Sequence, residues 1–114
     1  MNERDEVLLR DMLDAAQKVQ KFITGKTRAD LESNDFLLGF AVVRGIEIVG
    51  EAASKISSDT RQNLNQIPWK NIIGMRNRIA HDYTNVDYDI VWEVVTQNLP
   101  PLIEVLENLL PAQE

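Results

Sequence analysis

The stretch "GMRNRIAHDY", residues 74–83, places two arginines, an asparagine, a tyrosine and the only histidine of the chain within ten positions. An imidazole titrates near neutral pH, so His81 could act as a general acid or base. Five residues earlier, Arg76 carries a planar fork of donors that suits a phosphate or carboxylate oxygen. These residue types at this spacing could hold an anion beside a group that transfers protons.

A purely structural interpretation of the same residues is also available. On an ideal helix, Arg76 falls in the middle of the apolar stripe of residues 69–83, which predicts an inward-facing guanidinium that needs a partner. The flanking stripe residues are Ile72, Ile79 and Tyr83 on one side and Trp69 and Ala80 on the other. The partner could be Glu47 or Glu51, which share a helix face. Arg78 and Asp82, four residues apart, could form an ordinary surface pair.

Helices must position these side chains, because the apolar residues recur at helical spacing and no strand-like alternation is present. We expect an all-α bundle of four main helices, with the last one kinked or split at Pro100 and Pro101, which cannot donate backbone hydrogen bonds. The expected helices are Asn2–Thr24, residues 35–57, the segment 67–83 with Pro68 at the first helical position, and a last helix capped by Asp87. Asn2 can cap the first helix, Asp5 lies in its first turn, where the helix dipole favours anions, and Gly25 supplies its stop. Polar connections are expected at 25–35, with one short turn near Ala29–Glu32, and at 57–66.

Glycines within the second helix, Gly39, Gly45 and Gly50, indicate close backbone approach to a neighbouring helix. A length of 114 residues fits a single domain, 1–114. Without cysteine the chain can form neither disulfides nor zinc–thiolate sites. No run reaches the length of a membrane span, so a cytoplasmic protein is expected. The net charge of −6 argues against a broad nucleic-acid-coating surface, although a local basic cluster could still grip a phosphate.

The motif also carries a resemblance. "RNRIAHDY" matches the R-x4-H-x-Y motif of HEPN-domain toxins of the HepT-like family. The likeness extends to "SNDFLLGFAVVRGIEIVGEAASKI", to the segment that opens with Pro68-Trp69, and to "VDYDIVWEVVTQNLPPLIEVL". It therefore covers most of the chain.

The resemblance implies a HEPN-type helical homodimer in which the motif helices of both subunits meet. It implies a toxin with metal-independent endoribonuclease activity and no cofactor, paired with a minimal nucleotidyltransferase as antitoxin. The implied catalytic residues are Arg76 and His81, with Asn77 and Arg78 as supporting phosphate-binding residues. The antitoxin would silence the toxin by adding AMP to Tyr83.

RNA supplies its own nucleophile, the 2′-hydroxyl, so the protein needs only proton transfers and charge stabilisation. One histidine cannot easily perform both transfers, and a dimer would supply two copies of His81. Two alternatives stay open at this point. The chain could be a non-enzymatic helical binding module that pairs with a nucleotidyltransferase, or a dimer in which Arg76 only closes an internal ion pair.

Overall fold

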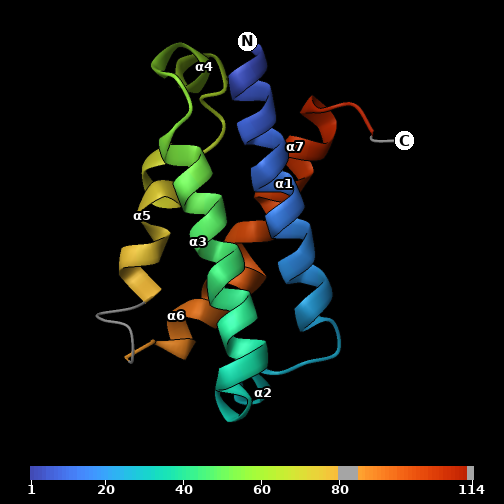
Figure 1. Ribbon diagram of the computed structural model, residues 1–114, viewed down its shortest axis with the longest axis vertical. Helices are drawn as coiled ribbons and strands as arrows, with labels where there is room; N and C mark the ends of the chain where they lie inside the picture. The colour runs from blue at the N-terminus through green and yellow to red at the C-terminus, as the bar shows by residue number, and fades with distance from the viewer. Residues whose placement is uncertain (80–84, 113–114) are drawn as a thin grey trace.

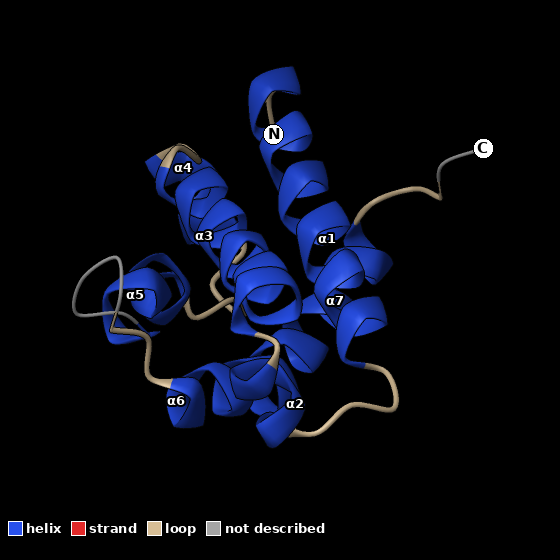
Figure 2. Ribbon diagram, turned by 60° about the horizontal axis from the view of Figure 1, so that its bottom comes forward, coloured by secondary structure: helices blue, strands red, loops and turns tan. Residues whose placement is uncertain are grey.

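The computed structural model describes residues 1–79 and 85–112, and every regular element within them is helical (Figures 1 and 2). The elements in chain order are α1 (Glu3–Ile23), α2 (Arg28–Ser33), the π-helical turn η1 (Asp35–Gly39), α3 (Phe40–Ser54), α4 (Ser58–Asn63), α5 (Trp69–Ile79), α6 (Tyr88–Glu93), the π-helical turn η2 (Val94–Asn98) and α7 (Leu99–Leu109). None of these helices is long and apolar enough to cross a bilayer.

The four long helices predicted from the sequence are confirmed when each π-helical turn is joined to the helices it adjoins. They are α1, η1 with α3, α5, and the continuous run from α6 through η2 to α7. Helix α3 lies between α1 and α5. Helix α7 packs against α1. This arrangement makes α3 the element against which the helix carrying Arg76 is placed.

The predicted helix signals at both ends of α1 are also confirmed. Asn2 caps the helix, with its side-chain oxygen accepting from the backbone N–H of Asp5 at 2.7 Å. Gly25 follows the helix with a φ of 73°, a conformation that costs glycine little. Asp87 caps α6 through its carboxylate, as expected.

The interruption expected at the two prolines takes the form of the wider turn η2. The Leu99 N–H donates to the oxygen of Val94, five residues back, instead of to that of Val95. The next residue, Pro100, has no N–H to offer the Val95 oxygen. Gln20 of α1 fills the gap, since its Nε2 donates to the Val95 oxygen at 2.8 Å. A side chain from α1 therefore stabilises the bend in the last helix.

Close helix approach at the glycines is confirmed as well. A Cβ added at Gly45 would overlap the Val19 side chain of α1. One at Gly39 would lie 2.6 Å from the Tyr88 hydroxyl. At Gly50 the neighbour is the backbone oxygen of Ile72, 3.2 Å away. The glycines thus bring α3 close to α1, α6 and α5.

The expectation that residues 57–66 form only a polar connection is wrong in part, because they contain the helix α4 (Ser58–Asn63). Ser57 caps this helix, and its hydroxyl and backbone N–H both donate to Asp5, at 2.5 and 3.1 Å. The Thr60 hydroxyl donates to the same carboxylate at 2.6 Å. Hydrogen bonds from Ser57 and then Thr60 lower the pKa of Asp5, although its burial opposes the shift. The signal missed in the sequence was the serine-capped start "SSDT".

Candidate active site

Helix α5 begins at Trp69, one residue after the predicted start at Pro68, and the Pro68 oxygen accepts the first hydrogen bond of the helix. The Ile72 N–H donates to the Pro68 oxygen at 3.0 Å. The indole N–H of Trp69 donates to the Leu64 oxygen, also at 3.0 Å, which fixes the start of α5 against the loop before it. The motif helix is therefore anchored at its N-terminal end.

The expectation that Arg76 points into the apolar stripe is wrong. The residues of α5 that are buried are Ile72, Met75 and Ile79, and the Arg76 side chain is 62% exposed. Met75 lies about 100° from Arg76 on the helix, so including it rotates the centre of the buried face away from the arginine. Arg76 lies at the edge of that face, where its guanidinium reaches solvent.

Arg76 is nevertheless paired, and the partner is one of the two carboxylates proposed from the sequence. Its Nε lies 3.5 Å from Glu47 Oε2, across the contact between α5 and α3. Glu51, one turn further along α3, instead lies 3.6 Å from Lys55 of its own helix. An exposed pair of this kind stabilises the fold by about 0–1 kcal/mol. A phosphate could therefore take the place of Glu47 at little cost.

The other basic residue of the motif lies on a different side of the helix. Arg78 Nη2 is 3.6 Å from Glu93 Oε2 of α6, and Asn77 is exposed. The predicted partner of Arg78, Asp82, lies outside the described residues. Two arginines in the last turn of α5 also lie near the negative end of its dipole. The last turn of α5 thus carries two arginines, and each is paired with a carboxylate of a neighbouring helix.

His81 and Tyr83, predicted as a catalytic residue and as the modified residue, also lie outside the described residues. The chain leaves α5 at Ile79, and the Asp87 N–H donates to the Ile79 oxygen at 2.8 Å. Both ends of the intervening segment therefore meet at one point, at the end of the helix that carries Arg76. Tyr88, the next tyrosine, packs against Gly39, and burial raises its pKa, with the Asp35 and Glu32 carboxylates adding to the effect.

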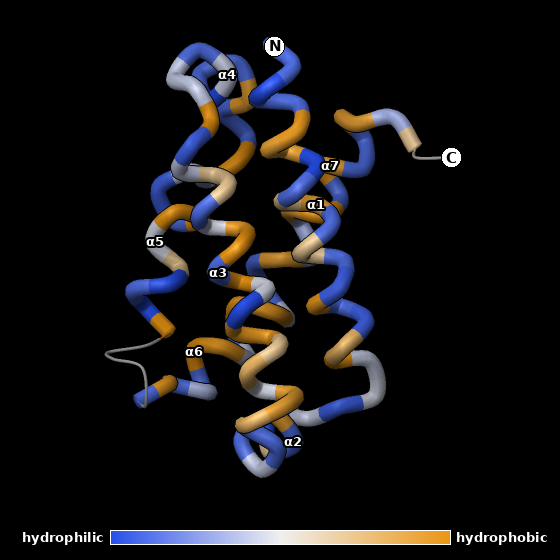
Figure 3. Tube along the Cα trace, in the orientation of Figure 1, coloured by the Kyte–Doolittle hydropathy of each residue, from blue (hydrophilic) through white to orange (hydrophobic). Residues whose placement is uncertain are grey.

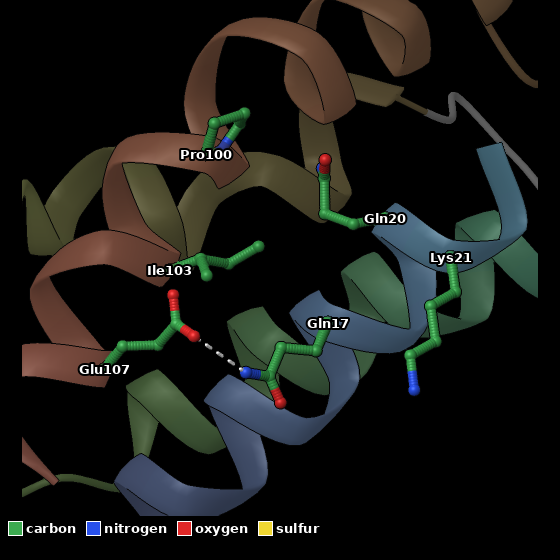
Figure 4. A pocket seen from close by; sticks show the side chains of 6 residues that line it. All are labelled: Gln17, Gln20, Lys21, Pro100, Ile103 and Glu107. Atoms are coloured by element: carbon green, nitrogen blue, oxygen red, sulfur yellow. Dashed lines mark hydrogen bonds between the residues drawn. The ribbon is translucent and has the colours of Figure 1, made fainter. Parts of the chain in front are cut away.

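A shallow groove of about 430 Å³ lies elsewhere, between α1 and α7 (Figure 4). Its polar side chains are already engaged, because Gln17 bonds Glu107 at 3.4 Å and Gln20 bonds the Val95 oxygen. Lys21 is the only cation that lines it. The groove lies on the far side of α3 from α5, so it is separate from Arg76 and Arg78.

Within the described ranges, no three histidine, cysteine or carboxylate side chains gather as metal ligands would. The chemistry available is that of a cationic fork, Arg76, held loosely by a carboxylate beside a segment that contains the single histidine. Such a cationic fork can bind an anion.

Comparison with known proteins shows that the chain is similar to ribonucleases. The profile of a family described as "Ribonuclease HepT-like" matches residues 12–109. "Putative RNase MJ1380" of Methanocaldococcus jannaschii is 33% identical over 112 residues, covering 94% of this chain and 98% of that protein. "Probable ribonuclease HepT" of Thermococcus cleftensis is 33% identical over 105 residues, covering 89% and 91%. No solved structure matches the chain at a significant level.

Proposed function

The chain belongs to the HepT-like ribonuclease family, and from this premise we propose that it is an endoribonuclease whose catalytic residues are Arg76 and His81. The observation that carries the proposal is the exposed guanidinium of Arg76, held 3.5 Å from Glu47 at the end of the helix that leads into His81. Residues 1–114 act as one domain in this proposal, and the enzyme works in the cytoplasm.

The reaction is an attack by the 2′-hydroxyl of RNA on the adjacent phosphorus. The O2′–P bond forms and the P–O5′ bond breaks, which leaves a 2′,3′-cyclic phosphate and a 5′-hydroxyl. A base takes the 2′-hydroxyl proton and an acid returns a proton to O5′. His81 suits either role because the pKa of an imidazole lies near neutrality. Every atom and proton balances without a metal or cofactor.

Arg76 would stabilise the charge that develops on the phosphorane oxygens. Its exposure favours this role, since a buried and fully paired guanidinium could not turn to a ligand. Arg78 and the exposed Asn77 supply further contacts to phosphates or the sugar backbone. The affinity should be salt-dependent, because these contacts replace counterions.

A homodimer completes the site in this proposal. A single chain has one histidine, whereas the reaction needs a base and an acid at the same phosphate. Two copies would supply both and would also pool two copies of Arg76. Gly74, on the same helix, has open space around its Cα, which would allow another backbone to approach closely.

The biological role in the proposal is that of a toxin whose antitoxin is a minimal nucleotidyltransferase. Transfer of AMP to the Tyr83 hydroxyl would form a phosphodiester and release pyrophosphate from ATP. The new phosphate would compete with RNA for Arg76, and the adenosine would block access. We expect co-expression with the antitoxin to add AMP units to wild type but not to Tyr83→Phe, as measured by intact mass. An adduct that persists in Tyr83→Phe would move the modification to another residue, such as Tyr88.

The activity is tested by analysing product ends. Purified protein in EDTA should cut a single-stranded RNA to 2′,3′-cyclic phosphate and 5′-hydroxyl ends, and should leave the same sequence in DNA intact. The DNA is a matched control because it differs only in lacking the 2′-hydroxyl nucleophile and in carrying thymine, which has one more methyl group, where the RNA has uracil. Cleavage of the DNA, or RNA cleavage that requires added magnesium, would contradict the mechanism.

A further inference from the structure

Three large apolar side chains lie exposed at the start of the second long helix. Phe36 is 81% exposed, Leu37 64% and Phe40 68%. Phe36 and Leu37 lie in η1, and Phe40 is the first residue of α3. We call these three residues the α3 patch, and Figure 3 shows the hydrophobic end of this helix. Single exposed apolar residues are common on protein surfaces, whereas a cluster of them is typical of an interaction surface.

The α3 patch shares a helix face with the carboxylate that holds Arg76. Phe40 and Glu47 are seven residues apart, which places them about 20° apart around the helix and about 10 Å apart along it. Helix α5 runs antiparallel to α3, since Ile72 meets Gly50 whereas Arg76 meets Glu47. The C-terminal end of α5 and the N-terminal end of α3, which carries the patch, therefore lie toward the same end of the molecule (Figure 1).

We propose that a second copy of this chain docks on the α3 patch, with the two α3 helices antiparallel about a two-fold axis near Phe40. The inference rests on the proposed function, because it assigns the surface that brings two motif segments together. In such an isologous interface, Phe40 of each subunit meets the corresponding region of the other. The aromatic side chains form the centre, where residues of this type contribute most to binding.

Charge favours a second copy over an unrelated occupant. Asp35 and Arg44 flank the patch, five residues before and four residues after Phe40. Neither forms an ion pair with any described residue. Antiparallel pairing about Phe40 brings Arg44 of one subunit level with Asp35 of the other, twice by symmetry. The surface is therefore complementary to itself, in both its apolar centre and its charged rim.

The test is the oligomeric state of the full chain, measured by sedimentation at micromolar concentration. Wild type should have the mass of two chains, and Phe40→Asp should dimerise about 30-fold more weakly or more. Phe22→Asp is the matched control, because Phe22 is also an exposed phenylalanine, 41% exposed, but lies on α1. It should remain a dimer, and circular dichroism should show all three proteins equally helical.

A charge exchange keeps the test decisive if Phe40→Asp fails to fold. Arg44→Glu should weaken the dimer, and adding Asp35→Arg should restore it, which loss of folding could not reproduce. A dimer unaffected by Phe40→Asp and by Arg44→Glu would overturn the assigned surface while leaving the proposed ribonuclease intact. A wild-type monomer would overturn the inference, and the patch would then belong to a different protein partner. A dimer without RNA cleavage would support the surface and contradict the function.

Discussion

The cluster around Asp5 and the cluster around Arg76 are both polar groups that join two helices, yet their environments are opposite. The Asp5 carboxylate is 1% exposed and accepts three hydrogen bonds from Ser57 and Thr60. The Arg76 guanidinium is 62% exposed and has one contact, at 3.5 Å, to Glu47. The first cluster has no capacity left for a ligand, whereas the second can exchange its partner for one.

This difference separates a group that holds the fold from a group that is available for function. A buried charge must be fully hydrogen-bonded, so any change at Asp5 acts on folding. An exposed ion pair contributes little to stability, so a change at Arg76 acts mainly on whatever the guanidinium binds. The comparison predicts that stability and activity respond to different substitutions.

The largest expected effect is on activity, from Arg76→Ala. Removing the cation that stabilises the transition state should lower kcat by about 10²-fold or more. The midpoint of thermal unfolding should change little, since the lost ion pair is exposed. Lys18→Ala, an exposed cation on α1, is the control and should retain full activity. An Arg76→Ala protein that unfolds instead of losing activity would erase the distinction between the two clusters.

The losses from Arg76→Ala and His81→Ala should also be strongly non-additive, because residues that act on one transition state work as a unit. The double variant should be about as inactive as the more damaging single variant, measured as kcat/KM on one RNA. Fully additive losses would indicate that the two residues act at separate steps.

The next effect is on stability, from Asp5→Asn. The pKa of Asp5 is lowered in the folded protein, so its stabilising effect is present above the ordinary aspartate pKa, near 3.9, and is lost as the pH falls through the lower folded value. We expect wild type to unfold at a clearly higher denaturant concentration than Asp5→Asn at pH 7, and the gap to narrow toward pH 2. Asp11→Asn, at an exposed site on the same helix, should show no such gap. An equal gap at pH 7 and pH 2 would mean that the ionised carboxylate is not what holds α4.

The smallest effect should come from Glu47→Gln. Stability should fall by no more than about 1 kcal/mol, because the pair is near the surface. RNA affinity should rise modestly, as measured by fluorescence anisotropy, since the carboxylate no longer competes with phosphate for Arg76. Glu51→Gln is matched in type and helix but pairs with Lys55, so it should leave affinity unchanged. Weaker binding by Glu47→Gln alone would show that Glu47 positions Arg76 for RNA instead of restraining it.

The elements that sequence patterns predicted correctly are those with local causes. The cap at Asn2, the stop at Gly25 and the cap at Asp87 each depend on residues within one turn. The prolines predicted the interruption of the last helix, but not that Gln20 would bond the oxygen they leave unpaired. That bond joins residues 75 positions apart, and no local pattern encodes it.

The candidate site was predicted in part for the same reason. Residue types and helix geometry predicted that Arg76 would pair with Glu47 or Glu51, and the structure shows Glu47. The inward orientation of Arg76 was wrong because Met75 was left out of the stripe. The role of Asp5 was missed because its position in the first turn of α1 already had a local explanation in the helix dipole. Its actual partner, Ser57, is 52 residues away.

The most direct test of the central claim is the rate of RNA cleavage by wild type and by His81→Ala, under single-turnover conditions in EDTA. A general acid–base group contributes about 10²–10⁴-fold, so the account predicts a loss of that size with the same melting temperature. Equal rates for wild type and His81→Ala would contradict the account, because the only histidine in the chain would then have no part in the reaction.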